Sequence, residues 1–294
     1  MNAATQGMLD LRRFDMVVEG IDVHVEGEGA ETVVMIHGWP DTYRLWDAQV
    51  DLLSGRRRCV RFTLPGFDPA KPPREPLPDE IVDTIAAIVD RVSPSVPVTL
   101  LLHDWGCVFG YQYAMRHAER VDRIVAVDIG DTNSGAFIRS LSLGAKAMVV
   151  FYQLWLALAW KLRGGTGTRM TRWMARRLRH PGDASKVTWQ MNYPYWHVWT
   201  GRAKGSLRVE PPCPIFYAYG ERKPFMFHSP KWLERIAALP ASKVQAFPSN
   251  HWVMLKATDE FNSAMLAWLD TTSSGARTAA RRAPVRPPLS TMPG

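Results

Sequence analysis

The sequence predicts an α/β fold, in which a mostly parallel sheet is covered by helices on both faces and interrupted by one inserted helical cap. Short β-branched runs alternate with helical stretches along the chain, a pattern typical of parallel strands joined by crossover helices. This alternation stops between residues 131 and 209 and then resumes. A chain of 294 residues, 46% of them hydrophobic, can bury one large core with a lid without disulfides or a structural metal.

The predicted strands can be placed in order along the chain. They lie at residues 16–25 (an antiparallel pair), 32–37, 59–64, 96–103, 123–129, 214–219 and 243–247. The helices between and after them are centred near Ala48, Ala86, Tyr113, Leu233 and Ala264. These elements place the catalytic core in residues 15–130 and 210–270.

Two segments depart from the core pattern. Residues 131–209 are too long for a structureless loop in a compact domain, so we expect them to form a helical cap over one edge of the sheet. Residues 271–294 are rich in Ser, Ala, Arg and Pro with almost no large apolar side chain. Such a segment cannot offset its ordering entropy by burial, so a disordered basic tail is predicted.

The net charge of +8 does not by itself define a function. Four arginines fall in the last 24 residues, and seven basic residues lie between Lys161 and Arg179. No nucleic-acid-binding motif accompanies either cluster, so we interpret both as solvated surface and expect no nucleic-acid partner.

The cysteines and the first twenty residues indicate in which cellular compartment the protein is expected. Cys59, Cys107 and Cys213 are odd in number and far apart, which predicts neither a disulfide framework nor a metal site. The first twenty residues contain no uninterrupted apolar core, so they do not resemble a signal peptide. We therefore expect a cytoplasmic protein.

The first chemical motif is an apolar strand that runs into Asp104 and turns at once into a helix. This is the arrangement of a nucleophile elbow, with Asp104 where a serine usually stands. The free N–H groups of a helix N-terminus would keep its carboxylate ionised and oriented. Alternatively, Asp104 is only the N-cap of that helix, a role that Asp often takes.

A second motif, His37-Gly38-Trp39-Pro40, follows the early strand and favours the nucleophile. In an oxyanion-hole loop of this kind, His37, Gly38 and Pro40 support the backbone. We expect the backbone N–H groups of Trp39 and Trp105 to stabilise negative charge on one oxygen.

The last strand supplies a general base. His251 follows it, which is where the chain order of nucleophile, acid and histidine places the base in such folds. Of the other histidines, His37 and His103 are interpreted as structural. The remaining five have no matching context, and they are His24, His117, His180, His197 and His228.

Together these motifs, at residues 37–40, 103–106 and 250–252, resemble those of the α/β-hydrolase epoxide hydrolases over residues 15–270. Haloalkane dehalogenases share much of the pattern. The resemblance implies an α/β-hydrolase fold with a carboxylate nucleophile. Many dehalogenases carry an Asn at the position of Trp39 to hold the halide, so Trp39 favours epoxides.

In the family, two cap tyrosines donate hydrogen bonds to the epoxide oxygen. The resemblance implies that Tyr152 is the early one. For the late one, Tyr193 and Tyr195 are both candidates, and Tyr193 is slightly preferred because Pro194 would fix the backbone beside it.

The acid that orients the histidine is where this sequence departs from the family. Many relatives carry it in a Gly-x-x-Asp motif, but Lys223 stands there, and a lysine cannot accept a hydrogen bond. Some dehalogenases place the acid after the strand at residues 123–129, which implies Asp128. Asp131 and Glu221 remain candidates, and Asp128 could instead be a structural cap.

The resemblance thus implies that an epoxide is opened to a vicinal diol through an alkyl ester on Asp104, without metal or cofactor. Substrates would be a small apolar epoxide and water, and twelve tryptophans suggest a sizeable apolar pocket. A haloalkane dehalogenase is the alternative enzyme. A non-catalytic receptor for a small ligand is the alternative from another class.

One apolar run, residues 148–160, is followed by the basic cluster that begins at Lys161. Such a segment could lie on a membrane surface. A buried cap helix is the preferred interpretation.

Overall fold

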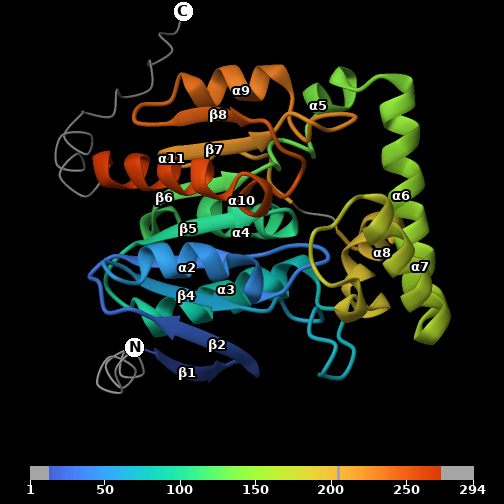
Figure 1. Ribbon diagram of the computed structural model, residues 1–294, viewed down its shortest axis with the longest axis horizontal. Helices are drawn as coiled ribbons and strands as arrows, with labels where there is room; N and C mark the ends of the chain where they lie inside the picture. Colours follow the sequence, from blue (N-terminus) through green and yellow to red (C-terminus); the bar gives the residue numbers. More distant parts are fainter. Residues whose placement is uncertain (1–12, 204–205, 273–294) are drawn as a thin grey trace, which may run out of the picture.

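The computed structural model describes residues 13–203 and 206–272, in which eight strands form one sheet (Figure 1). Across the sheet the strand order is β1-β2-β4-β3-β5-β6-β7-β8. The strands are β1 (Arg13–Val18), β2 (Ile21–Glu26), β3 (Thr32–Ile36), β4 (Arg58–Phe62), β5 (Val98–His103), β6 (Val121–Val127), β7 (Ile215–Gly220) and β8 (Lys243–Phe247). β2 runs antiparallel to β1 and β4, and the other neighbours are parallel. This is the predicted α/β-hydrolase fold.

Helices cover both faces of this sheet (Figure 1). The core helices are α2 (Asp47–Leu53), α3 (Pro78–Val92), α4 (Trp105–Arg116), α9 (Pro230–Ala237), α10 (Val253–Lys256) and α11 (Thr258–Thr271). Between β6 and β7 lie α5 (Gly135–Ser140), α6 (Leu143–Leu162), α7 (Gly164–Arg177) and α8 (Tyr193–Thr200). Short 3-10 turns are η1 (Tyr43–Trp46), η2 (Ala118–Arg120), η3 (Ala184–Lys186) and η4 (Trp189–Asn192).

Two hydrophobic clusters lie on the two faces of the sheet because the central strands alternate between them. On β5, Leu100 and Leu102 join the cluster that contains α3 and α4, whereas Leu101 joins the cluster that contains α2 and α11. Every residue of β5 is buried. Near-continuous apolar strands are expected where helices cover both faces of a parallel sheet.

We call α6, α7, α8 and the segments between them the cap. The cap lies beyond one end of the sheet, on the right of Figure 1. Side chains of the cap bond to the core: the Tyr193 hydroxyl donates to the Pro65 carbonyl at 2.9 Å, and the Gln190 amide donates to the Lys71 carbonyl at 3.1 Å.

Helix α6 and the C-terminal segment were both subjects of expectations from the sequence. α6 is not the buried cap helix that we preferred for residues 148–160, because only 28% of its apolar window is buried. The predicted disordered tail lies outside the described residues except for Thr271, which ends α11, and Thr272.

Close packing behind Asp104 depends on Gly106. A Cβ added there would lie 2.2 Å from the Ile36 carbonyl oxygen and 2.6 Å from the His37 carbonyl oxygen. Both are backbone atoms that cannot rotate away. The first turn of α4 therefore touches the end of β3 directly, which brings the turn at Asp104 up to the loop after β3.

We expect Gly106→Ala to lower the free energy of unfolding by about 1–3 kcal/mol, because the added methyl group forces these backbones apart. Gly144 on α6 is the matched control, since a Cβ there would meet nothing within 4 Å. Gly144→Ala should be neutral or stabilise by up to about 1 kcal/mol. Urea unfolding midpoints measure both, and equal stability of the two variants would contradict the close contact.

Candidate active site

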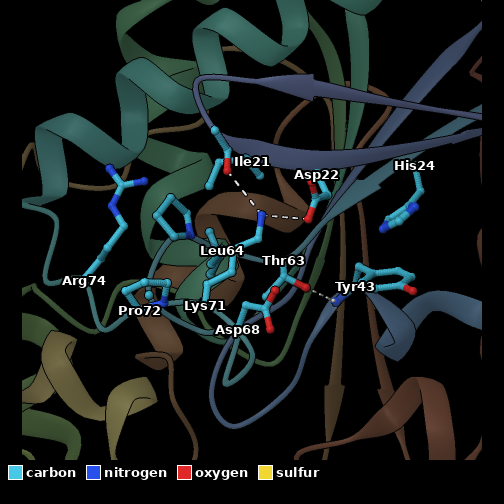
Figure 2. A pocket seen from close by; sticks show the side chains of 13 residues that line it. Ile21, Asp22, His24, Tyr43, Thr63, Leu64, Asp68, Lys71, Pro72 and Arg74 are labelled. Carbon is cyan, nitrogen blue, oxygen red and sulfur yellow. Dashed lines mark hydrogen bonds and ion pairs between the residues drawn. The ribbon is translucent and has the colours of Figure 1, made fainter.

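Two cavities in the described part of the chain differ in their lining, and the larger of the two contains the predicted nucleophile beside the predicted base. The smaller, of about 280 Å³, lies between β2 and the loops after β4 (Figure 2). Lys71 in its wall pairs with Asp22 at 2.7 Å and donates to the Gly20 carbonyl at 3.3 Å. At this cavity Lys71 therefore forms a structural ion pair.

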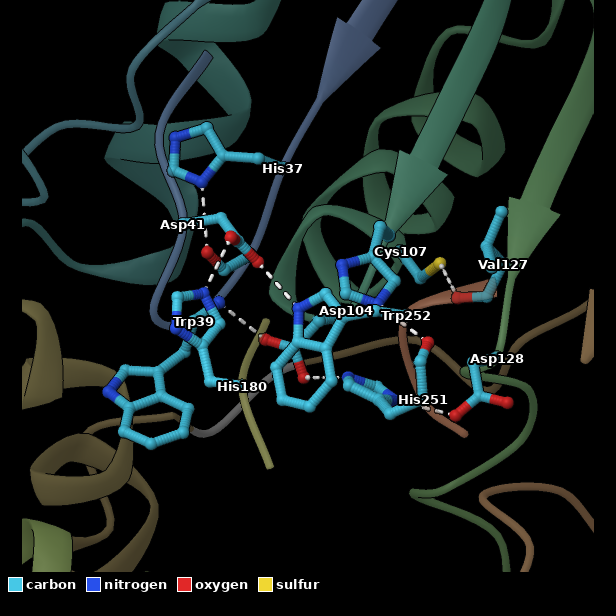
Figure 3. A network of polar contacts seen from close by, with 12 residues as sticks. His37, Trp39, Asp41, Asp104, Cys107, Val127, Asp128, His180, His251 and Trp252 are labelled. Atoms are coloured by element: carbon cyan, nitrogen blue, oxygen red, sulfur yellow. Dashed lines mark hydrogen bonds and ion pairs between the residues drawn. The ribbon is translucent and has the colours of Figure 1, made fainter. Parts of the chain in front are cut away.

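The larger cavity, of about 520 Å³, contains Asp104 and His251 and lies between the core and the cap. Asp104 stands at the turn from β5 into α4 with a φ of 52°, a conformation that L-residues rarely adopt. It occupies the N-cap position, yet its side chain makes no capping hydrogen bond. The carboxylate is turned toward the loop after β3 instead (Figure 3).

That loop holds one oxygen of the carboxylate. The Trp39 backbone N–H donates to Asp104 Oδ1 at 2.6 Å. A Cβ added to Gly38 would lie 2.4 Å from both Asp104 Oδ1 and the Trp105 backbone nitrogen, so both atoms border the same point. Oδ1 therefore lies where an oxyanion would be stabilised, and Oδ2 is left to attack.

His251 lies between two carboxylates. Its Nε2 is 3.3 Å from Asp104 Oδ2, and its Nδ1 is 2.5 Å from Asp128 Oδ2. Asp128 is fully buried just after β6, and its φ of 71° turns the side chain toward His251. The imidazole is thus held in one orientation with Nε2 facing the nucleophile.

Neither alternative acid contacts His251. The Asp131 carboxylate accepts hydrogen bonds from Ser134 Oγ and from the backbone and hydroxyl of Ser229, which ties the loop between β6 and α5 to the start of α9. Glu221 lines the cavity wall and is exposed. The geometry supports Asp128 as the partner of His251.

Lys223 forms an ion pair with Asp128, a role that the sequence did not predict. Its buried ammonium group bonds to Asp128 Oδ1, which also accepts from the Gly220 backbone N–H at 3.0 Å. Burial would raise the pKa of Asp128, but Lys223 and His251 together lower it. The lysine at the usual acid position thus keeps the relocated acid ionised.

The carboxylates determine the protonation of His251. Burial would lower the pKa of its imidazole, but hydrogen bonds to Asp104 and Asp128 and the charges of both carboxylates raise the pKa to about 9. The imidazole is therefore protonated at neutral pH while Asp104 is free. An imidazolium cannot accept a proton, so it becomes a base only after the charge on Asp104 is removed.

The two histidines interpreted as structural lie beside the site and are neutral. Burial lowers the pKa of His37 and of His103 to about 4. His37 Nε2 accepts from the Leu64 backbone N–H at 2.9 Å. His103 Nε2 lies 3.1 Å from the His251 carbonyl oxygen. Beside His37, the Trp39–Pro40 peptide bond is cis.

A second network, also absent from the sequence prediction, fixes the residue after His251 (Figure 3). Asp41 accepts from the Trp252 indole N–H at 2.9 Å and lies 3.0 Å from Nε2 of His180. His180 comes from the cap, just after α7. The loop of the base is therefore tied to both the oxyanion loop and the cap.

Among the cap tyrosines, Tyr193, the slightly preferred candidate, lies away from Asp104. Its hydroxyl is committed to the Pro65 carbonyl, and its ring packs against Phe67 at 5.7 Å, outside the cavity lining. Tyr195 and Tyr152 both line the cavity with Asp104, and their ring centroids are 6.0 Å apart.

Burial keeps both cavity tyrosines protonated. It raises the pKa of Tyr152 to about 12 and that of Tyr195 well above its usual value, and the nearby Asp104 charge contributes to both shifts. Both hydroxyls therefore retain a proton to donate at neutral pH. In the described part of the chain, no cluster of three or more potential metal ligands occurs.

Comparison with known proteins agrees with this architecture. The sequence profile of the alpha/beta hydrolase family matches residues 33–264. The chain belongs to that family. The crystal structure of Bacillus megaterium epoxide hydrolase in complex with an inhibitor superimposes with a TM-score of 0.66 at 18% identity, over 87% of this chain and all of that one, which shows a common fold.

Curated relatives of this alpha/beta hydrolase carry different names. It is 35% identical to the probable oxidoreductase EphD of Mycobacterium tuberculosis over 115 residues, which are 37% of this chain and only 19% of that protein. It is 26% identical to the cis-3-alkyl-4-alkyloxetan-2-one decarboxylase of Xanthomonas campestris over 294 residues, covering 88% of this chain and 95% of that protein.

The position of His251 between two carboxylates yields a titration prediction. In Asp104→Asn one of the two negative charges beside His251 is gone, so we expect the pKa of His251 to fall from about 9 by about 1–3 pH units. NMR titration of labelled histidine measures it. Asp22→Asn, which removes a carboxylate at the other cavity, should leave the His251 titration unchanged. An unchanged His251 in Asp104→Asn would contradict the pairing.

Proposed function

We propose that this alpha/beta hydrolase opens epoxides to vicinal diols through an alkyl ester on Asp104. The observation that carries the proposal is the arrangement of Asp104: its Oδ1 accepts from the Trp39 N–H, and its side chain lines a cavity together with Tyr152 and Tyr195. In epoxide opening, the oxygen that leaves the attacked carbon stays on the substrate and needs a proton. A nucleophile and proton donors that line the same cavity suit such a reaction.

In the first step, Asp104 Oδ2 attacks an epoxide carbon and the carbon–oxygen bond of the ring breaks. The electron pair of that bond goes to the ring oxygen, which takes a proton from the hydroxyl of Tyr152 or Tyr195. Both phenols are protonated at neutral pH because burial raises their pKa values. The product is an alkyl ester, and the charge on Asp104 has disappeared.

Loss of that charge prepares the second step. The pKa of His251 falls, its proton passes to the phenolate left on Tyr152 or Tyr195, and the neutral imidazole takes a proton from water. The water oxygen attacks Cγ of Asp104, and the Trp39 and Trp105 N–H groups stabilise the oxyanion on Oδ1. Collapse breaks the bond from Cγ to the ester oxygen, which takes the proton held by His251 as the diol leaves. The remaining proton of the attacking water then passes from the Asp104 carboxyl to His251, which restores the starting charges.

The indole of Trp39 argues against halide release. Its Nε1–H donates to Asn192 Oδ1 of the cap at 2.8 Å, and both side chains are buried. A leaving halide needs free N–H donors to replace its water shell. The indole N–H of Trp39 already donates its hydrogen bond to Asn192.

The oxetanone decarboxylase of Xanthomonas campestris, which aligns along nearly all of its length, supports a second candidate. An oxetan-2-one is a strained cyclic ester, and Asp104 could attack a ring carbon in the same way. Loss of carbon dioxide would leave an alkene and consume no water. The different products separate this reaction from epoxide hydrolysis.

The deciding experiment offers the purified protein aryl and alkyl epoxides, 3,4-dialkyl oxetan-2-ones and chloro- and bromoalkanes in parallel. We expect diols from epoxides. Alkene release from oxetanones without diol formation would establish the second candidate. Halide release would place the protein with the dehalogenases, and no product from any class would favour a receptor.

Trapping the ester tests the covalent mechanism directly. In His251→Gln the attack by Asp104 still proceeds but water is not activated, so the intact mass should rise by one substrate on a peptide that contains Asp104. Asp128→Asn should accumulate the same adduct, because the imidazole then loses the partner that orients it. Asp104→Ala is the control and should gain nothing. An adduct on another residue would contradict this mechanism.

The two late tyrosines form a matched pair for the proton donor. Tyr195→Phe should slow ester formation by about 100-fold, because one donor to the ring oxygen is lost. Tyr193→Phe should leave that rate unchanged and cost about 1 kcal/mol of stability, since its hydroxyl bonds only to the Pro65 carbonyl. Rapid-quench mass spectrometry of a single turnover measures both rates. A slower Tyr193→Phe with a normal Tyr195→Phe would reverse the assignment.

A further inference from the structure

The outer side of the cap exposes an unusual amount of apolar surface. On α6, exposed side chains recur at helical spacing, while Leu156, Ala159 and Trp160 on the other side are buried. We define the apolar cap face as the following residues, each between 42% and 84% exposed: Leu143, Val150, Phe151, Leu154, Leu158, Leu162 and Trp173 of α7. A helix that is apolar on both sides needs a second apolar environment.

Aromatic contacts make this face continuous from α6 to α7. The ring of Phe151 lies 5.9 Å from that of Trp155, and Trp155 lies 4.8 Å from Trp173. Tryptophan is the residue that membrane–water interfaces favour most, since its ring is apolar and its N–H is polar. The face therefore has the composition of an interfacial surface.

Positive charge borders the apolar cap face. On α7, Arg169 and Arg176 stand four residues before and three residues after Trp173, so they share its side of the helix. Both are exposed, and within the described ranges neither forms an ion pair with an acid. At the end of α6, Lys161 and Arg163 are exposed as well.

The segment of the chain that contains the cap is strongly basic. Residues 132–209 contain thirteen lysines and arginines and a single acid, Asp183. This segment carries a net charge of +12 in a chain whose total is +8, so the rest of the chain is net negative. Basic side chains around an apolar face complement a bilayer with anionic headgroups.

We propose that the cap docks on an anionic phospholipid surface, with α6 lying along it and the arginines of α7 contacting the headgroups. α6 is long and apolar enough to cross a bilayer. Its packing into the cap through Trp160 and Leu156 favours an orientation along the surface instead. Met148 of α6 and Arg177 of α7 line the Asp104 cavity, so the same two helices contribute to the cavity and to the apolar cap face.

Vesicle flotation of the full chain tests the docking without any reference to turnover. Wild type should float with phosphatidylcholine vesicles that contain about one third phosphatidylglycerol and stay unbound with phosphatidylcholine alone. Leu154→Gln/Leu158→Gln should bind about ten-fold or more weakly, because two side chains no longer enter the interface. Neither leucine lines the cavity. Arg169→Gln/Arg176→Gln should weaken binding to the anionic vesicles in the same assay.

Matched controls come from other surfaces of the chain. Phe14→Gln/Val17→Gln replaces exposed apolar side chains on β1, far from the cap in sequence. Arg56→Gln/Arg91→Gln removes two exposed charges from the surface of the sheet domain. Both should bind like wild type. Docking is excluded if wild type fails to bind anionic vesicles, or if the leucine variant binds as well as wild type.

Two other occupants of the face would give distinct results, and each would overturn the proposal. A wild-type dimer that the leucine substitutions convert to a monomer, without vesicle binding, would assign the face to a second copy of the chain. Binding to duplex DNA that survives the leucine substitutions, without vesicle binding, would assign the basic surface to nucleic acid. Sedimentation velocity and a fluorescence-anisotropy titration distinguish them.

Discussion

The buried cluster of Asp104, His251, Asp128 and Lys223 is the interaction on which the rest of the site depends. Two carboxylates face an imidazolium and an ammonium group, so the cluster is balanced while Asp104 is free. Buried charges are tolerated only when they are paired and hydrogen-bonded. An ester on Asp104 would remove one negative charge and leave an excess of positive charge. Release of the proton of His251 would restore the balance, so in the proposed mechanism formation of the ester would itself generate the base.

Backbone geometry places both carboxylates in this cluster. Asp104 and Asp128 each follow a parallel strand with a positive φ, of 52° and 71°. Such conformations cost of order 1–3 kcal/mol each and persist where the surrounding contacts determine them. For Asp104 the contacts are the Trp39 N–H and the tight approach of Gly106 to β3. For Asp128 they are the Gly220 N–H and Lys223.

Features encoded in contiguous residues could be predicted from the sequence, and features that depend on distant contacts could not. The fold follows from strand and helix patterns, and Asp104 follows from one strand–turn–helix segment. Lys223 was recognised only as a residue unable to act as the acid, because its partner Asp128 lies 95 residues away. The choice between Tyr193 and Tyr195 depends on helix phase: residues two apart on α8 point about 200° apart, so one faces Pro65 when the other faces the cavity.

Trp39 connects the chemistry of the core to the cap. Its backbone N–H holds Asp104, while its indole donates to Asn192, whose amide donates to Thr171 Oγ1 of α7 at 2.7 Å. Thr171 is buried on the inner side of α7, and Trp173 is exposed two residues later on the outer side. The inner side of α7 is therefore linked through Asn192 to the loop that holds Asp104, so a shift of this helix would have to break these hydrogen bonds or move Trp39 with it.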